Sequence, residues 1–357
     1  MSDNIDSGRM KIEDIDRKIV ELVSMRTEAA REIGRSKLER RLPLRDETVE
    51  EKVVSRFEQL CAAKGISDHT ARQLASLLIR ESVDAQSMLP RPSEPRDVIV
   101  IGGAGRMGSW MCRYLESRGH RVSVWDRADS IPKARDISEG IRAADFVVIA
   151  TPISVTAECL RKVAEFRPPG TVFDISSIKA PLIPMLKRSV REGMRMCSVH
   201  PMFGPDTVSV FDRNVIICDC GDRTAADEAS ELMNWGGARI VRMPVEGHDE
   251  LMAYVLGLSH ALNLAFFRAL VRSDRSYKSL ESVSSTTFRK QIATSRDVAF
   301  ENPELYYEIQ HLNPHNSEAL DNMIKSMEEV REAGRSKDGG LLAEIMRSGR
   351  EYFGGTG

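Results

Sequence analysis

Apolar residues recur at alternating three- and four-residue steps through the first 89 residues of the chain, the spacing of amphipathic helices. The first such stripe predicts a helix from about Met10 to beyond Ser36 with a buried apolar face. Its members are Ile12, Ile15, Ile19, Leu22, Ala29 and Ile33. A second helix is expected to start at the Asp46–Glu47 pair, and a third follows KGISDHT, where Ser67 or Asp68 is the expected N-cap.

The same helical stepping places polar and charged side chains on the apolar faces. Helix by helix they are Arg9, Arg26 and Lys37, then Asp46 and Glu50, then Ser82 and Gln86. A charge that faces a core is costly unless it is paired. One interpretation is an internal salt-bridge network, or arginines whose ends reach solvent. A cluster with an excess of cations favours the other interpretation, a site for an anionic ligand.

Beyond this segment the pattern changes twice. LPRPSEPRD lacks periodicity and indicates a linker, and from Val98 short apolar runs alternate with helical stretches, which predicts a parallel sheet with crossover helices. The strand candidates are VIVIGG, RVSVWD, DFVVIATP, GTVFDIS, MCSVHP and NVIICD. After about residue 246 the spacing is helical. We therefore expect a multidomain chain with an all-α module (1–90), a linker (91–97), an α/β Rossmann domain (98–245) and an all-α domain (246–357).

Composition narrows the class of protein. The 357 residues include 51 basic and 53 acidic side chains, a net charge of −2, so no basic excess favours a nucleic-acid or membrane-surface partner. We expect neither a signal peptide nor a membrane span, because the N-terminus is polar and acidic and no apolar run reaches about 18 residues. The six cysteines show no CxxC pair and no zinc-ligand spacing, which favours a reduced, cytoplasmic protein without a metal.

The run IVIGGAGRMGSWMCRYL follows a strand candidate and opens a helix. It places Gly103, Gly105 and Gly108 in the spacing GxGxxG, which provides a tight turn, close approach of the backbone to a pyrophosphate and helix–strand packing. The next strand ends in Asp126, 23 positions after Gly103, where a carboxylate accepts hydrogen bonds from a ribose and repels a 2′-phosphate. NAD is therefore the expected cofactor, although Arg127 leaves NADP open and a glycine turn without a nucleotide is the alternative.

His200 differs in its setting from most of the seven histidines. It follows the strand candidate MCSV and precedes PMFGPD, and open α/β sheets bind their ligands at such strand ends. A neutral imidazole there can accept the proton of a substrate hydroxyl while a hydride leaves. The alternative is a structural histidine.

Nearly all of residues 5 to 89 resembles the all-helical chorismate mutase module that is fused to enzymes of aromatic biosynthesis, notably in GRSK, PLRDETVEE and ESVDAQ. The resemblance implies the pericyclic conversion of chorismate to prephenate, which needs conformational restraint and charge stabilisation rather than an acid or base. It implies substrate binding by Arg9, Arg26, Asp46 and Ser82, and catalysis by Lys37, Glu50 and Gln86. It also implies a homodimer in which Arg9 reaches the partner's site, while a further family arginine is replaced by Val49.

Residues 97 to about 310 resemble prephenate dehydrogenase in ATPISVT, DISSIK, HPMFGPD and EGHDELMAYVLGLSH. The resemblance makes His200 the catalytic histidine, Ser177 a hydroxyl that holds His200 or the substrate, Lys179 a nearby cation and His260 a residue that faces the cleft. It assigns cofactor binding to Gly103, Gly105, Arg106, Met107, Gly108, Asp126, Thr151 and Pro152.

The family's substrate-binding arginine precedes a Pro-x-x-Tyr/Trp element, which is matched here by ENPELYYE. Strict register places Asp297 at that position, one residue after Arg296. A one-residue irregularity of the helix would bring the Arg296 side chain to the substrate-binding position, and Arg289 is the alternative.

The two resemblances together imply a bifunctional enzyme of tyrosine biosynthesis. His200 takes the proton of the C4 hydroxyl, hydride passes to NAD, and the ring carboxylate leaves as carbon dioxide, which produces 4-hydroxyphenylpyruvate. One alternative is an arogenate dehydrogenase. The other is a dehydrogenase whose helical module only dimerises or senses an effector, which Val49 supports and the charged residues oppose, since a dimerisation seam prefers apolar residues.

Overall fold

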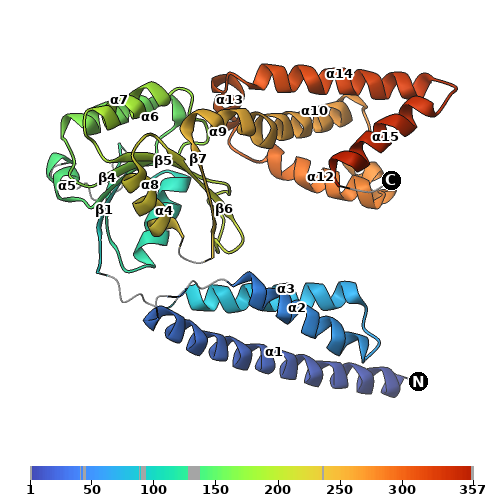
Figure 1. The fold of residues 1–357 in the computed structure, drawn as a ribbon. Coiled ribbons are helices and arrows are strands. Elements are labelled where there is room, and N and C mark those ends of the chain that lie inside the picture. Colours follow the sequence, from blue (N-terminus) through green and yellow to red (C-terminus); the bar gives the residue numbers. More distant parts are fainter. Residues whose placement is uncertain are drawn as a thin grey trace. The chain divides into compact units, whose positions relative to one another are not determined.

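The N-terminal module contains the three helices that the pattern predicts. The computed structural model describes residues 2–40, 42, 46–87, 89, 94–127, 137–234 and 237–354, with the backbone alone for 2–4 and 47. The helices are α1 (Ser2–Glu39), α2 (Glu47–Ala62) and α3 (Asp68–Ser87) (Figure 1). Asp46 caps α2 by accepting from the Val49 amide, and Ser67 caps α3 by accepting from the Thr70 amide. Helix α1 starts at Ser2 rather than near Met10.

The apolar stripe of α1 is not buried within one chain, so that prediction is wrong for the isolated subunit. Ile19 is 52% exposed, and the other five stripe residues are exposed as well. Helix α1 packs on α3 through a different face, which buries Thr27, Ala30 and Gly34. Because α1 has 38 residues and α3 only 20, α3 cannot cover the whole of α1.

A seven-stranded sheet follows, in the order β2-β1-β3-β4-β5-β6-β7. The strands are β1 (Asp97–Ile101), β2 (Arg121–Trp125), β3 (Phe146–Ile149), β4 (Thr171–Asp174), β5 (Met196–Pro201), β6 (Asn214–Asp219) and β7 (Arg239–Pro244). The pattern did not predict β7, whose exposed edge carries charged side chains. The sheet is not wholly parallel either, because β5 and β6 run antiparallel. Their connection, residues 202–213, is fully described and holds no helix that could carry the chain back across the sheet.

Helices cover both faces of this sheet (Figure 1). Helices α4 (Arg106–Glu116) and α8 (Arg223–Met233) share one apolar core with alternate strand residues such as Val98 and Val100. The Tyr114 hydroxyl joins them by donating to the carbonyl of Met233 at 3.2 Å. Three further helices also pack on the sheet: α5 (Ile137–Ala143) on β1, α6 (Ile153–Glu165) on β3 and α7 (Ile183–Arg191) on β5. The carboxyl ends of β1 to β5, which are mutually parallel, therefore meet at one edge.

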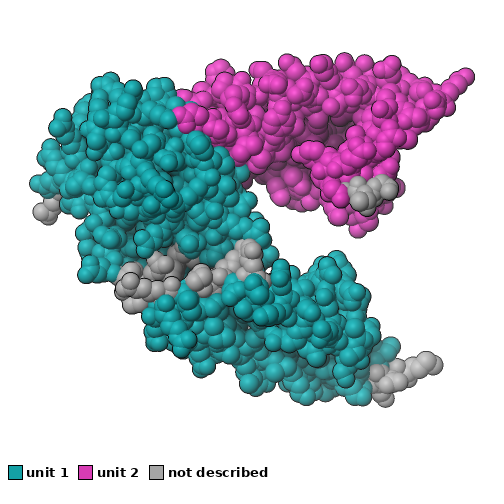
Figure 2. All heavy atoms as spheres, in the orientation of Figure 1, with its two compact units in different colours: residues 1–177, 182–245 teal, residues 178–181, 246–357 magenta. Residues whose placement is uncertain are grey.

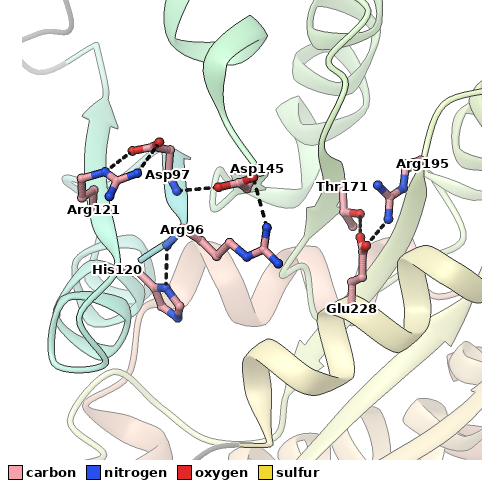
Figure 3. A network of polar contacts seen from close by, with 8 residues as sticks. All are labelled: Arg96, Asp97, His120, Arg121, Asp145, Thr171, Arg195 and Glu228. Atoms are coloured by element: carbon pink, nitrogen blue, oxygen red, sulfur yellow. Dashed lines mark hydrogen bonds and ion pairs between the residues drawn. The ribbon is translucent and has the colours of Figure 1, made fainter. Parts of the chain in front are cut away.

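Charged side chains tie the opposite edge of the sheet (Figure 3). Arg121, at the start of β2, donates to both carboxylate oxygens of Asp97 at 2.6 and 2.7 Å. Asp145, just before β3, accepts from the Asp97 amide at 2.9 Å and pairs with Arg96 at 3.4 Å. Farther along this edge, Glu228 of α8 accepts from Thr171 and Arg195. These contacts link the amino ends of strands, away from the ends where a ligand is expected.

The chain divides into two compact units, residues 1–177 with 182–245 and residues 178–181 with 246–357 (Figure 2). In the second unit, α9 (Val245–Met252), the π-helical η1 (Ala253–Leu258) and α10 (Ser259–Arg272) run without a break. The remaining helices are α11 (Tyr277–Ser282), α12 (Thr286–Ala299), α13 (Pro303–Leu312), α14 (Asn316–Arg335) and α15 (Gly340–Tyr352). The expected linker at 91–97 lies partly outside the described residues.

The sequence led us to expect no membrane span, but the helix from Val245 to Arg272 is long and apolar enough to be one. It has 28 residues, and its most apolar window has a mean hydropathy of 1.4. Only 11% of that window is buried within the chain. An apolar helical surface is thus available in the second unit.

Candidate active sites

Helices α1 and α3 bring Arg26, Ser82 and Gln86 together. Arg26 Nη1 donates to Ser82 Oγ and, at 2.6 Å, to the carbonyl of Leu78. Burial and the nearby Arg56 lower the pKa of Arg26. Gln86 lies one turn after Ser82 and is 6% exposed, and its Oε1 has no hydrogen-bond partner in the described part of the chain. A buried amide oxygen of this kind is an unsatisfied acceptor that a ligand or a water can satisfy.

Gly34, in the motif GRSK, is what permits the close approach of α1 to this part of α3. A Cβ at Gly34 would lie 2.8 Å from Gln86 Cγ and 2.7 Å from Leu89 Cδ1. Lys37 follows three residues later, so it projects from the same side of α1. The glycine thus determines how near the Gln86 side chain lies to α1.

The other candidates of the helical module are less concentrated. Asp46 is engaged as the N-cap of α2, and Glu50, one turn later, lines an open pocket of about 720 Å³. The side chain of Arg9 is 74% exposed and pairs with Asp6 on its own helix at 3.2 Å. Val49 is also exposed. Within one chain the structure gathers Arg26, Ser82 and Gln86 and leaves Arg9 outside that group.

The glycine loop after β1 requires residues without a Cβ. Gly102 has a φ of +86°, and a Cβ there would lie 2.6 Å from the carbonyl oxygen of Ala150. A Cβ at Gly108 would lie 2.1 Å from the carbonyl oxygen of Gly102, and one at Gly103 would lie 2.6 Å from Val124 Cγ1. The sequence motif missed Gly102, although the doubled glycine in VIVIGG was its signal. These contacts bring β1, β2, β3 and the start of α4 close together, as a dinucleotide loop requires.

The remaining cofactor candidates lie at the same edge of the sheet. The Asp126 carboxylate, directly after β2, accepts from the Ala104 amide of the glycine loop at 2.9 Å. Gly105 caps α4, and Arg106 at its first position pairs with Asp206 at 3.0 Å. Met107 packs against the core, and Thr151 and Pro152 follow β3, where Pro152 is the N-cap of α6. The amino end of α4 and the carboxylate that follows β2 suit an adenine dinucleotide.

β5 coincides with the strand candidate MCSVHP, and His200 lies inside it, one residue before its carboxyl end. His200 is 3% exposed and opposite Ile216 of β6. Ser198, two residues earlier on the same face of the strand, donates from Oγ to Asp174 Oδ2 of β4 at 2.5 Å. Ser177 follows β4 by three residues. Because β4 and β5 are parallel, Ser177 and His200 lie toward the same edge as the glycine loop.

Two further features of this region were not predicted. The Lys179 side chain is fully buried rather than displayed on a surface, and its backbone amide donates to Asp249. Asp249 is also buried, and His248 Nδ1 lies 2.6 Å from its Oδ1. His248 and Asp249 fall inside the motif EGHDELM, yet nothing in the spacing showed that the Asp249 carboxylate contacts the segment after β4.

In the second unit, the ring of His260 stacks on Tyr306 with centroids 4.3 Å apart. Burial lowers the pKa of His260, so the imidazole is neutral near pH 7, and its Nδ1 has no partner among the described residues. Tyr306 belongs to ENPELYYE, and burial, with a smaller effect of Glu301, raises its pKa. The stack presents an aromatic face with an unused ring nitrogen.

Arg296 and Arg289 both lie on α12 and are exposed. This helix is regular from Thr286 to Ala299, so the irregularity expected near Arg296 is absent from these described residues. Arg296 lines a pocket of about 330 Å³ whose other walls include Phe267, Tyr277 and Phe300. Arg289 does not line that pocket.

Comparisons with known proteins agree with both halves of this picture. The Chorismate mutase type II family matches residues 8–87, the nucleotide-binding domain of prephenate dehydrogenase matches 118–242, and the prephenate dehydrogenase dimerization domain matches 244–348. The T-protein of Haemophilus influenzae is 25% identical over 352 residues, 97% of this chain and 91% of the relative. A probable arogenate/prephenate dehydrogenase of Methanocaldococcus jannaschii is 28% identical over 273 residues, 72% of this chain but only 61% of that relative.

A solved structure shows the same fold. Prephenate dehydrogenase from A. aeolicus, in complex with hydroxyphenyl propionate and NAD+, superimposes with a TM-score of 0.58 and 19% identity, covering 74% of this chain and 99% of that one. The helical module, the nucleotide-binding sheet and the dimerization helices are thus each matched by a family of their own. The chain therefore belongs to the family of bifunctional proteins that join a type II chorismate mutase to a prephenate dehydrogenase.

Proposed function

We propose that this chain converts chorismate to prephenate, and prephenate to 4-hydroxyphenylpyruvate by NAD-dependent oxidative decarboxylation, as a step in tyrosine biosynthesis. The observation that supports both activities best is that one chain holds the Arg26–Ser82–Gln86 group and, in its α/β domain, the glycine loop with His200. The product of the first reaction is the substrate of the second. The domains we propose are residues 1–90, 98–245 and 246–357, joined by a linker at 91–97.

In the mutase site we assign Arg26 to a substrate carboxylate, with Ser82 positioning its guanidinium. Lys37 and Gln86 are assigned to the breaking ether oxygen, where negative charge develops in the transition state. Asp46 and Glu50 complete the polar wall, and Arg9 is assigned to the site of the partner subunit. The unsatisfied Oε1 of Gln86 and its proximity to α1 support a ligand at this place.

In the dehydrogenase site we assign His200 as the general base that takes the proton of the C4 hydroxyl. Ser177 holds His200 or the hydroxyl, and Lys179 adds positive charge to the region. NAD, when bound, supplies the hydride acceptor. Loss of the ring carboxylate as carbon dioxide makes the ring aromatic, which favours product formation.

Substrate recognition in the dehydrogenase is assigned to the second unit. We place the side-chain carboxylate of prephenate on Arg296, with Arg289 as the alternative, and the ring near the neutral His260. The pocket beside Arg296, which combines one cation with aromatic walls, supports Arg296 over Arg289, which does not line it. We propose prephenate rather than arogenate as the substrate, because a mutase in the same chain supplies prephenate.

We propose NAD rather than NADP as the cofactor. Without Cβ atoms, the glycines let the loop backbone come close to a pyrophosphate. The dinucleotide would be held by Gly103, Gly105, Arg106, Met107, Gly108, Asp126, Thr151 and Pro152. The Asp126 carboxylate is already fixed by the glycine loop, so it would disfavour a 2′-phosphate at that position.

We propose a homodimer that covers two apolar surfaces, the α1 stripe and the helix from Val245 to Arg272. Both are largely exposed within one chain, and large exposed apolar surfaces mark interaction sites. The dimerization-domain match over residues 244–348 supports the second surface. No disulfide joins the six cysteines, all of which lie among the described residues, and this supports a reduced, cytoplasmic setting.

The test is to supply chorismate with and without NAD. Without NAD, chorismate should disappear and prephenate should accumulate. With NAD, NADH should appear and 4-hydroxyphenylpyruvate should replace prephenate. Chorismate that persists while supplied prephenate is oxidised would reduce the helical module to a dimerisation or sensing role. Faster turnover of arogenate than of prephenate would reassign the dehydrogenase.

A further inference from the structure

A short stretch of chain after β4 is held at both ends by buried carboxylates. At one end Asp174, 0% exposed, accepts from the Ser176 amide at 2.9 Å. At the other end Asp249, 2% exposed, accepts from the Lys179 amide at 2.9 Å and from the Ala180 amide at 2.6 Å. Ser177 lies between the two anchored amide groups.

Each carboxylate has further partners that hold it in place. Asp174 accepts from Ser198, which is its register partner on β5 and lies two residues before His200. The Asp249 carboxylate is held by His248, whose Nδ1 lies 2.6 Å from Asp249 Oδ1. The backbone of Asp249 is held by Asn313, which donates to its carbonyl at 2.8 Å. Burial acts to raise the pKa of Asp249, but the bonds from His248 and the two amides outweigh it and keep that pKa below its usual value. The carboxylate is therefore ionised, and charge-assisted bonds to amides are the stronger kind.

We propose that Asp249 is a positioning residue of the dehydrogenase, that it acts through the amides of Lys179 and Ala180 on Ser177, and that Asp174 holds the other end of the same segment. The proposal rests on the assignment of Ser177 and His200 made above. A hydroxyl on a segment anchored at one end alone can drift, and a displacement of about 1 Å in an active site costs about 10²-fold in rate. Two anchors restrict that drift.

The chain offers an internal control, because the mutase activity of the same protein reports on folding independently of Ser177. The variant is Asp249→Asn, which removes the charge with little change in size. Its matched control is Glu250→Gln, which makes the same change at the exposed neighbouring residue of α9. We expect kcat for prephenate oxidation to fall about 10²-fold in Asp249→Asn, with KM, NAD affinity and mutase rate within about threefold of wild type. Glu250→Gln should match wild type in all four.

A double-mutant cycle with Ser177→Ala separates positioning from general stabilisation. If Asp249 acts through the Ser177 hydroxyl, Asp249→Asn should cost less than about threefold in the Ser177→Ala background. An equal cost in both backgrounds, or a parallel loss of mutase activity, would overturn the proposal. If Asp249→Asn does not fold, the cycle is run with Asp249→Glu, which keeps the charge and moves the acceptor atoms, and with Asp174→Asn at the other anchor. The same non-additivity with Ser177→Ala is expected, and additive costs overturn the proposal.

A failure of the underlying assignment looks different. If Ser177→Ala and His200→Asn both leave prephenate oxidation unchanged, the dehydrogenase site itself has been assigned wrongly. In that case the effect of Asp249→Asn has no bearing on Ser177.

Discussion

The two candidate sites of this chain are built in opposite ways. The dehydrogenase candidates of the α/β domain lie at the ends of parallel strands, where glycine contacts and buried hydrogen bonds such as Ser198 to Asp174 fix them within one chain. The mutase candidates project from long helices, and one of them, Arg9, is 74% exposed in the single subunit. In this chain the strand ends place their candidates within one subunit, whereas the role of Arg9 depends on what packs against α1.

The largest expected effects separate the two sites. Arg26→Ala removes the proposed carboxylate clamp and should nearly abolish mutase turnover while oxidation of supplied prephenate stays near normal. His200→Asn should do the reverse, because asparagine keeps a hydrogen bond but cannot accept the proton, and loss of a general base costs about 10² to 10⁴ in rate. Both rates are measured on each variant. A folded variant that loses both activities would contradict two separate sites.

The proposed sharing of the mutase site between subunits predicts complementation. Arg9→Ala and Arg26→Ala homodimers should both be nearly inactive as mutases. Co-expressed at equal levels, half of the dimers are mixed, and each mixed dimer has one site with both arginines, so about a quarter of the wild-type mutase rate should return. No recovery would mean that Arg9 acts in its own chain or not at all.

A smaller change is expected in the preference for NAD over NADP, which we assign to Asp126. Asp126→Ser removes the charge that opposes a 2′-phosphate, so the preference for NAD over NADP in kcat/KM should fall by about tenfold. Arg127→Ala in the wild-type background is the control and should not improve NADP. A wild-type enzyme that already prefers NADP would show that Arg127 outweighs Asp126.

The smallest expected effect concerns pH. Burial holds the pKa of His260 below its ordinary value of 6.5, so the unfolded chain takes up the proton first as the pH falls. The free energy of unfolding should therefore decrease below pH 6.5, until the folded-state pKa is passed. His260→Phe should weaken this decrease when urea midpoints are compared at pH values above and below 6.5. An unchanged pH dependence would assign the effect to other groups.

Local patterns predicted much of the fold because they express short-range physics. Alternation and periodicity located β1 to β6 and the three N-terminal helices, and the caps Asp46 and Ser67 act within one turn of their own helices. The glycine spacing predicted the dinucleotide loop because steric exclusion of a Cβ is local to a turn. Even here Gly102 was missed, since its constraint comes from Ala150, which directly follows β3.

By itself, the sequence determined the kinds of element, their order and the residue types available for chemistry. Only the tertiary structure decided that β6 runs antiparallel to β5, that the α1 stripe is exposed, and that Asp249 reaches the amides of Lys179 and Ala180 some 70 positions earlier. The physical reason is that these features depend on contacts between residues far apart in the sequence. Periodicity records which face of a helix is apolar but not what covers it, and a buried carboxylate is tolerated only where distant backbone donors meet it, which no local spacing encodes.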